Sequence, residues 1–133
     1  MKEILVPTSP GELIDKITIL RLKTEHVAQE DKLANVRREL AALEATAAAH
    51  IPDSPTLKGL WEELYEINAD LWAIEDDIRA MDARGDFGEG FVALARAVYV
   101  TNDRRAAVKR RINLFLGSVL VEEKSYSRHG GGA

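Results

Sequence analysis

Apolar residues recur along most of this chain in steps of three and four, the spacing that places them on one face of an α-helix. The clearest run lies between Ser54 and Gly85. Its apolar positions are Leu57, Leu60, Leu64, Ile67, Leu71, Ile74, Ile78 and Met81. Ser54 is a favourable N-cap, Pro55 suits a first helical turn, and Gly85 can adopt the left-handed backbone that ends helices. The pattern predicts one long helix over residues 55–84.

Two shorter, mostly apolar runs with the same spacing precede this helix. Ser9, Pro10 and Glu12 form a helix start, with a cap, a first-turn proline and the glutamate of a capping box. The first run is Leu13, Ile17, Leu20, Thr24 and Val27, and the second is Leu33, Val36, Leu40 and Leu43. The second run is one residue out of phase with the first. This slip predicts a break or kink near Asp31, with Asp31 as a new N-cap.

A last helix is predicted over residues 91–116, after glycines at positions 85, 88 and 90. Its seam is Phe91, Leu94, Val98, Thr101, Arg105, Val108, Ile112 and Phe115, in which two central positions are polar. The short turn predicts that the last two helices are antiparallel neighbours. Residues 2–6 and 119–121 are too short for helices, and a two-stranded pairing of these end segments is one alternative.

We therefore expect an all-α fold, a helical bundle built on a long antiparallel hairpin of residues 55–84 and 91–116. An N-terminal helical segment packs against this hairpin. The chain has 133 residues, which suits one domain. The expected domain covers residues 1–126, and residues 127–133 are expected to be a disordered tail because they contain little that could pack.

Composition argues against several classes of function. The net charge of −4 at pH 7 argues against a general nucleic-acid binder. The chain has no cysteine and its three histidines lack ligand spacing, so neither a metal nor a cofactor is expected. No apolar run reaches the roughly 18–20 residues that span a bilayer, and the N-terminus lacks the apolar core of a signal peptide. The expected location is the cytoplasm.

The polar interruption in the last seam indicates a candidate site, because a break in a consistent pattern often has a functional cause. Counting outward from the turn places Arg105 opposite Leu71 and puts the polar stripes of both helices on one face. We then expect Glu75 near Asn102, with Arg105 within reach. The candidate ligand-binding residues are Asn68, Trp72, Glu75, Arg79, Asn102, Arg105, Lys109 and Asn113.

Three interpretations of this cluster remain open. As a structural layer, a bridge between Glu75 and Arg105 would fix the register of the bundle. As an anion site, Arg79, Arg105 and Lys109 outnumber Glu75 and suit phosphate or carboxylate groups. The basic run at residues 104–111 could instead form a surface for nucleic acid or membrane, although its side chains point around the whole helix.

An acidic motif offers a weaker alternative. Residues 62–66 match the EExxE pattern by which all-helical nucleotide pyrophosphohydrolases bind magnesium. The second acidic half of that motif is absent. A solvated acidic face is therefore the simpler interpretation.

Four stretches resemble an uncharacterised bacterial family, a domain of unknown function. They are SPGELIDKITIL (9–20), KLANVRREL (32–40), LWAIEDDIR (71–79) and FVALARAVYVTNDRRAAVKRRIN (91–113). The combination of LWxIEDDIR with NDRRxxxKxxIN is the specific part. Members of that family often accompany glycosyltransferases in surface-polysaccharide gene clusters, or are fused to them. The resemblance implies this context and no biochemical activity.

Two hypotheses follow. In the first, the protein binds a phosphorylated sugar or sugar nucleotide in bacterial surface-glycan assembly. In the second, it is a non-catalytic helical adaptor or oligomerisation partner of a glycosyltransferase, and the polar cluster is structural. A homodimer is compatible with both. No nucleophile lies beside a base in the sequence, so no reaction type can be assigned.

Overall fold

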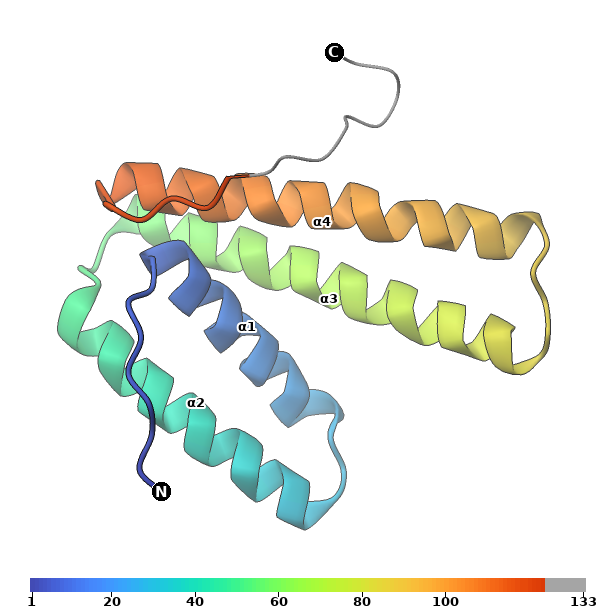
Figure 1. Ribbon diagram of the computed structural model, residues 1–133, viewed down its shortest axis with the longest axis horizontal. Coiled ribbons are helices and arrows are strands. Elements are labelled where there is room, and N and C mark those ends of the chain that lie inside the picture. The colour runs from blue at the N-terminus through green and yellow to red at the C-terminus, as the bar shows by residue number, and fades with distance from the viewer. Residues whose placement is uncertain (124–133) are drawn as a thin grey trace.

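The computed structural model describes residues 1–123 and contains four α-helices (Figure 1). They are α1 (Pro10–His26), α2 (Glu30–His50), α3 (Pro55–Ala83) and α4 (Glu89–Phe115). The prediction of an all-α fold is confirmed. Within residues 1–123, none of the helices combines the length and the apolar character that a membrane span requires. The expected disordered tail, residues 127–133, lies outside the described part of the chain.

The alternative of a two-stranded pairing is wrong for the described residues. Residues 2–6 and 119–121 form no regular secondary structure, and residues 1–123 contain no strand. The side chains of Ile4 and Leu5 are exposed, as is that of Val119. Two isolated strands have little stability in water without a third strand or a packed apolar face.

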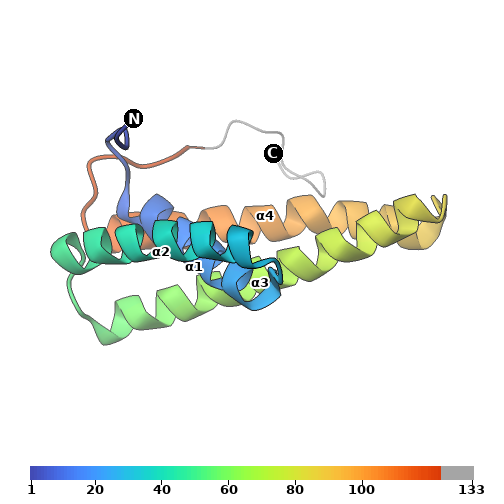
Figure 2. The same ribbon diagram turned by 90° about the horizontal axis from the view of Figure 1, so that it is seen from below.

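The helices are arranged as two antiparallel pairs. Helices α1 and α2 lie side by side, and this pair covers one half of the longer α3–α4 pair (Figures 1 and 2). Helix α1 contacts all three other helices and is therefore the central element of the covered half. The other half of the α3–α4 pair extends beyond α1 and α2.

The helix ends explain where the chain turns. Ser54 Oγ accepts a hydrogen bond from the Leu57 N–H at 3.3 Å, and Gly85 adopts a φ of +68°, as the sequence predicts. The expected break near Asp31 is a complete interruption over residues 27–29. The N-cap is Gln29, however, and not Asp31. Asp31 instead lies in the first turn of α2, where a carboxylate interacts favourably with the helix dipole.

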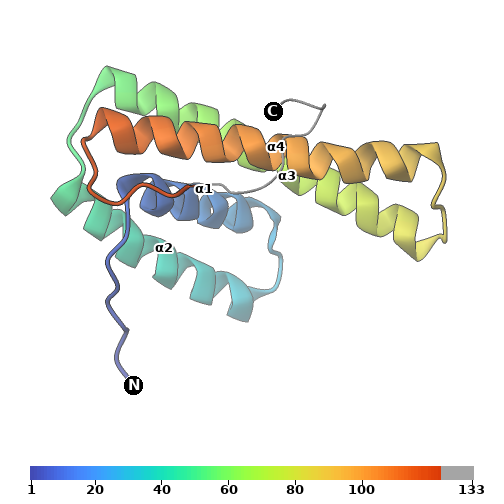
Figure 3. The same cartoon turned by 45° about the horizontal axis from the view of Figure 1, so that its top comes forward.

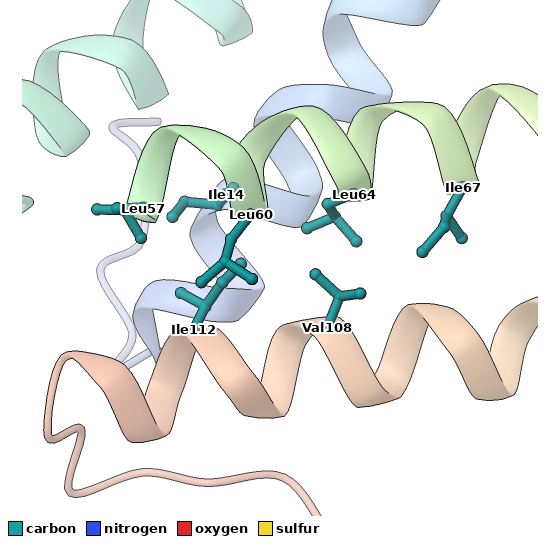
Figure 4. Close-up of a cluster of buried hydrophobic side chains, with 7 residues drawn as sticks. All are labelled: Ile14, Leu57, Leu60, Leu64, Ile67, Val108 and Ile112. Atoms are coloured by element: carbon teal, nitrogen blue, oxygen red, sulfur yellow. The ribbon is translucent and has the colours of Figure 1, made fainter. Parts of the chain in front are cut away.

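The main hydrophobic core lies where α1 crosses α3 and α4. Its buried members are Ile14, Leu57, Leu60, Leu64, Ile67, Val108 and Ile112 (Figure 4). A second cluster joins Leu13 and Ile17 of α1 to Ala47 of α2. No residue from 69 to 100 is fully buried. We call residues 69–100 the distal half of the α3–α4 pair, since only two helices pack there.

Helix α1 approaches α4 so closely that only glycine fits at the contact. A Cβ atom on Gly11 would lie 2.5 Å from the backbone oxygen of Lys109 and 2.9 Å from Asn113 Oδ1. We expect Gly11→Ala to lower the free energy of unfolding by about 1–3 kcal/mol, because one helix must move away from the other.

Gly59→Ala is the matched control. A Cβ at this position in α3 meets nothing within 4 Å, so the substitution should stabilise the helix by about 0.5–1 kcal/mol. Urea unfolding of both variants measures the two effects. A loss at Gly59 as large as that at Gly11 would contradict the close approach.

Candidate functional site

The centre of the polar cluster is a buried ion pair between α1 and α4. Arg105 Nε donates to Asp15 Oδ1 at 2.8 Å, and Arg105 Nη2 donates to Asp15 Oδ2, so the guanidinium binds both carboxylate oxygens. The Asp15 side chain is 1 % exposed and that of Arg105 is 26 % exposed. This geometry is the bidentate form that makes arginine–carboxylate pairs strong and directional.

Helix α3 completes the hydrogen bonding of this pair. Asn68 Nδ2 donates to Asp15 Oδ1 at 2.9 Å and lies 2.9 Å from Thr18 Oγ1. Thr18 in turn donates to the backbone oxygen of Asp15 at 2.7 Å. Within residues 1–123, no buried side-chain nitrogen or oxygen lacks a hydrogen-bond partner. A buried charge is tolerated here because its neighbours satisfy it completely.

Charge pairing shifts the pKa values of the two central cations. The hydrogen bond to Asp15 raises the pKa of Arg105 above its ordinary value, against the effect of burial. Burial alone would lower the pKa of Lys109, but hydrogen bonds to Glu12 and Glu122 raise it overall. Both side chains therefore stay protonated throughout the neutral range.

Lys109 and Asn113 belong to a separate set of contacts farther along α4. Lys109 Nζ lies 2.6 Å from Glu12 Oε2 and 3.0 Å from Glu122 Oε2. Asn113 Oδ1 accepts a hydrogen bond from the Gly11 N–H at 2.7 Å. These contacts bind the first turn of α1 to α4 and hold the close approach at Gly11.

A pocket of about 290 Å³ lies beside the buried pair, between α1, α3 and α4. We call it the Trp72 pocket. It is lined by Ile19, Leu22, Asn68, Leu71, Trp72, Glu75, Asp76, Arg79 and Arg105. Asp76 and Arg79 are exposed, so the pocket opens to solvent. Five of the eight predicted site residues therefore line one pocket.

The walls of the Trp72 pocket combine an aromatic ring with charged groups. The rings of His26 and Trp72 are stacked, with their centroids 4.6 Å apart, so His26 supports one face of the indole. Arg79 Nη2 lies 3.6 Å from Glu75 Oε2 on the same helix; the Arg79 side chain is largely exposed and that of Glu75 is half-buried. Arg105 Nη1 has only a long contact of 3.5 Å to Asn102 Oδ1. Of the Arg105 nitrogens, Nη1 therefore has the weakest hydrogen bond within the protein and is the least committed donor.

A larger cavity of about 730 Å³ lies on the other side of α1, against α2 and the start of α3. Arg21, one of its charged groups, binds Glu44 at 3.0 Å and lies 5.1 Å from the ring centroid of Trp61. None of the eight predicted site residues lines this cavity. We therefore place the candidate site in the smaller pocket.

The structure changes the pairing that the sequence predicted. Arg105 binds Asp15 and not Glu75, because α1 brings a buried carboxylate closer than the neighbouring helix does. Lys16, which also lies on α1, binds Glu39 of α2 and takes no part in the cluster.

The missed carboxylate had a signal in the sequence. Buried residues of α1 on the side of α3 and α4 include Gly11, Asp15, Thr18 and Leu22, spaced by four, three and four. This is a helical seam in which most members are not apolar. Reasoning from apolar periodicity alone passes over such a seam.

No metal centre accompanies the cluster in the described residues. Within 1–123, no three histidine, aspartate or glutamate side chains converge as metal ligands. Glu63, from the acidic motif on α3, instead binds Arg111 of α4 at 3.1 Å.

Comparison with known proteins identifies a family. A family model with the description "Family of unknown function (DUF6165)" matches residues 4–130, which is almost the whole chain. No curated protein and no solved structure matches the chain.

Proposed function

The chain belongs to the DUF6165 family of unknown function, and we propose that it binds a small anionic sugar derivative in the Trp72 pocket. The ligand class is a phosphorylated sugar or a sugar nucleotide, and the setting is bacterial surface-glycan assembly in the cytoplasm. The supporting observation is the convergence of Trp72, Arg79 and Arg105 on one solvent-open pocket. The resemblance to a family that accompanies glycosyltransferases supports the sugar part of this proposal.

The chemistry of the walls fits both parts of such a ligand. The C–H face of a sugar ring is apolar and can pack on an indole ring, while amide and carboxylate groups bind its hydroxyls. Arg79 and the less committed edge of Arg105 can donate to a phosphate. Glu75 and Asp76 balance these cations. A ligand with one phosphate and several hydroxyls therefore fits better than a polyanion.

The size of the pocket favours a single ring. A volume of about 290 Å³ is at the lower end of the range for small-molecule sites. The sugar phosphate would occupy the pocket, and the nucleoside of a sugar nucleotide would extend into solvent. Asp15 acts as a positioning residue in this proposal, since it fixes the plane of the Arg105 guanidinium.

Calorimetric titration with glucose 1-phosphate and UDP-glucose tests this proposal. We expect saturable binding that Arg79→Gln weakens about tenfold, which corresponds to one lost charge-assisted hydrogen bond. Trp72→Ala should weaken it at least as much. Arg111→Gln is the matched control, because Arg111 binds Glu63 away from the pocket and should leave affinity unchanged. Equal loss in the Arg111 variant, or no binding of either ligand, would rule out this site.

An adaptor or oligomerisation role is the second candidate. Its support is the distal half, where two helices pack without a third and no residue from 69 to 100 is fully buried. Val92 is 51 % exposed and Tyr99 is 41 % exposed on α4. A glycosyltransferase or a second copy of the chain could cover this surface.

Light scattering tests whether a second copy does so. An oligomerisation role requires a concentration-dependent mass above the 14.7 kDa of the monomer, which Val92→Lys returns to the monomer value. A mass of one protomer at every workable concentration would exclude the dimer.

A further inference from the structure

The segment after α4 turns back along the helix that it follows. Gly117 has a φ of +65°, which reverses the chain, and the Ser118 N–H donates to the backbone oxygen of Asn113 at 2.8 Å. Ser118 Oγ binds the backbone oxygen of Leu120 at 2.7 Å. Figure 3 shows this red segment running back beside α4, near the start of α1.

Two consecutive carboxylates in this segment meet two consecutive cations on α4. Glu122 Oε2 lies 3.0 Å from Lys109 Nζ, and Glu123 Oε1 lies 2.6 Å from Arg110 Nη1. The Lys109 side chain is only 11 % exposed, while both glutamates are largely exposed. The cationic groups are therefore fixed on a helix, and their partners belong to a segment without regular secondary structure.

The segment reverses the charge of its surroundings. Seven charged groups form the local network, namely Glu12, Asp15, Arg105, Lys109, Arg110, Glu122 and Glu123. Four carboxylates against three cations give a net charge of −1. Without Glu122 and Glu123, two carboxylates against three cations give +1. The cluster can therefore attract an anion only when the segment moves away.

We infer that Lys109 and Arg110 form a second anion-binding site, which the chain's own Glu122 and Glu123 occupy in this structure. The external ligand that matches this pattern carries two adjacent negative charges, as a diphosphate group does. Glu122 and Glu123 compete with it from within the molecule. The two cations of this second site, Lys109 and Arg110, lie outside the lining of the Trp72 pocket, and the inference does not depend on the proposed function.

The competition is weak enough for an external ligand to win. A short tether gives the two glutamates an effective concentration in the millimolar range. Each pair has one largely exposed partner, and such pairs stabilise little. A diphosphate brings more acceptor oxygens than two carboxylates and can reach both cations at once.

The test is a titration with inorganic pyrophosphate at low salt. We expect the double variant E122Q/E123Q to bind pyrophosphate about tenfold more tightly than the original chain, equivalent to about 1.4 kcal/mol. Arg110→Gln in the E122Q/E123Q background should remove that gain. The three substituted positions, 110, 122 and 123, are exposed, so the fold should persist. A thermal melt of each variant verifies this.

E62Q/E66Q is the matched control, because it changes the net charge by the same amount at two exposed positions of α3 and leaves the Glu63–Arg111 pair intact. It should leave pyrophosphate binding unchanged. The inference is overturned if E122Q/E123Q and the original chain bind pyrophosphate equally. It is also overturned if E62Q/E66Q reproduces the gain, since the effect would then come from net charge alone. Trp72→Ala should not alter the gain, which separates this site from the sugar pocket.

Discussion

Arg105→Met is expected to lower the free energy of unfolding by about 3–5 kcal/mol, because it leaves the carboxylate of Asp15 buried without a counter-ion. Asp15 is 1 % exposed and cannot recover hydration without a rearrangement of α1. Asn68 would still donate to this carboxylate, but it carries no positive charge. Thr18 donates to the backbone oxygen of Asp15 and cannot replace the lost contact. Urea unfolding monitored by circular dichroism measures the loss.

A second substitution separates an unpaired charge from lost packing. Asp15→Asn in the Arg105→Met background removes the charge and keeps an acceptor for Asn68, so it should restore most of the stability. Arg104→Met is the matched control, because Arg104 is exposed and lies 3.8 Å from Asp70. It should change stability by less than about 0.5 kcal/mol. An Arg105 variant as stable as this control would contradict a structural role for the pair.

The second large effect is expected in the core. Leu64→Ala should lower the free energy of unfolding by about 2–5 kcal/mol, because Leu64 is 0 % exposed and packs where α1 meets α3 and α4. Leu71→Ala removes the same atoms two turns farther along α3. It should cost less than half as much, because Leu71 is only half-buried and lines the Trp72 pocket. Equal losses in urea unfolding would mean that the distal half is covered in solution.

The long helices could be predicted from sequence because their local signals agree. The seam of α3, its cap at Ser54 and the glycine at position 85 all indicate the same helix. The spacing cannot indicate how deeply each member is buried. Leu64 and Leu71 occupy equivalent positions in the seam, yet only Leu64 lies beneath α1. The burial of an α3 residue depends on whether α1 extends over it. The spacing of apolar residues in α3 does not encode the length of α1.

The sequence grouped residues that line one pocket in the structure, but it did not identify the partner of Arg105. Counting outward from the turn placed Arg105 opposite Leu71, and both residues line the Trp72 pocket. The count used only α3 and α4, so it could not find Asp15 on α1. Glu122 could not be predicted either, because its position depends on a reversal of the chain at Gly117 and not on any helical spacing. Both omissions are carboxylates, which is why the sequence overstated the positive charge of the cluster.

The Asp15–Arg105 pair determines when the protein can complete its folding during synthesis. Its two residues are 90 positions apart, and the contact between Gly11 and Asn113 joins residues 102 apart. Ribosomes add about 5–20 residues per second and release the N-terminal end first. Helix α1 therefore leaves the ribosome several seconds before Arg105, the counter-ion of Asp15, has been synthesised. Until α4 is complete, Asp15 remains hydrated and opposes burial of α1. Helix α1 can therefore reach its final packing only after α4 has been synthesised.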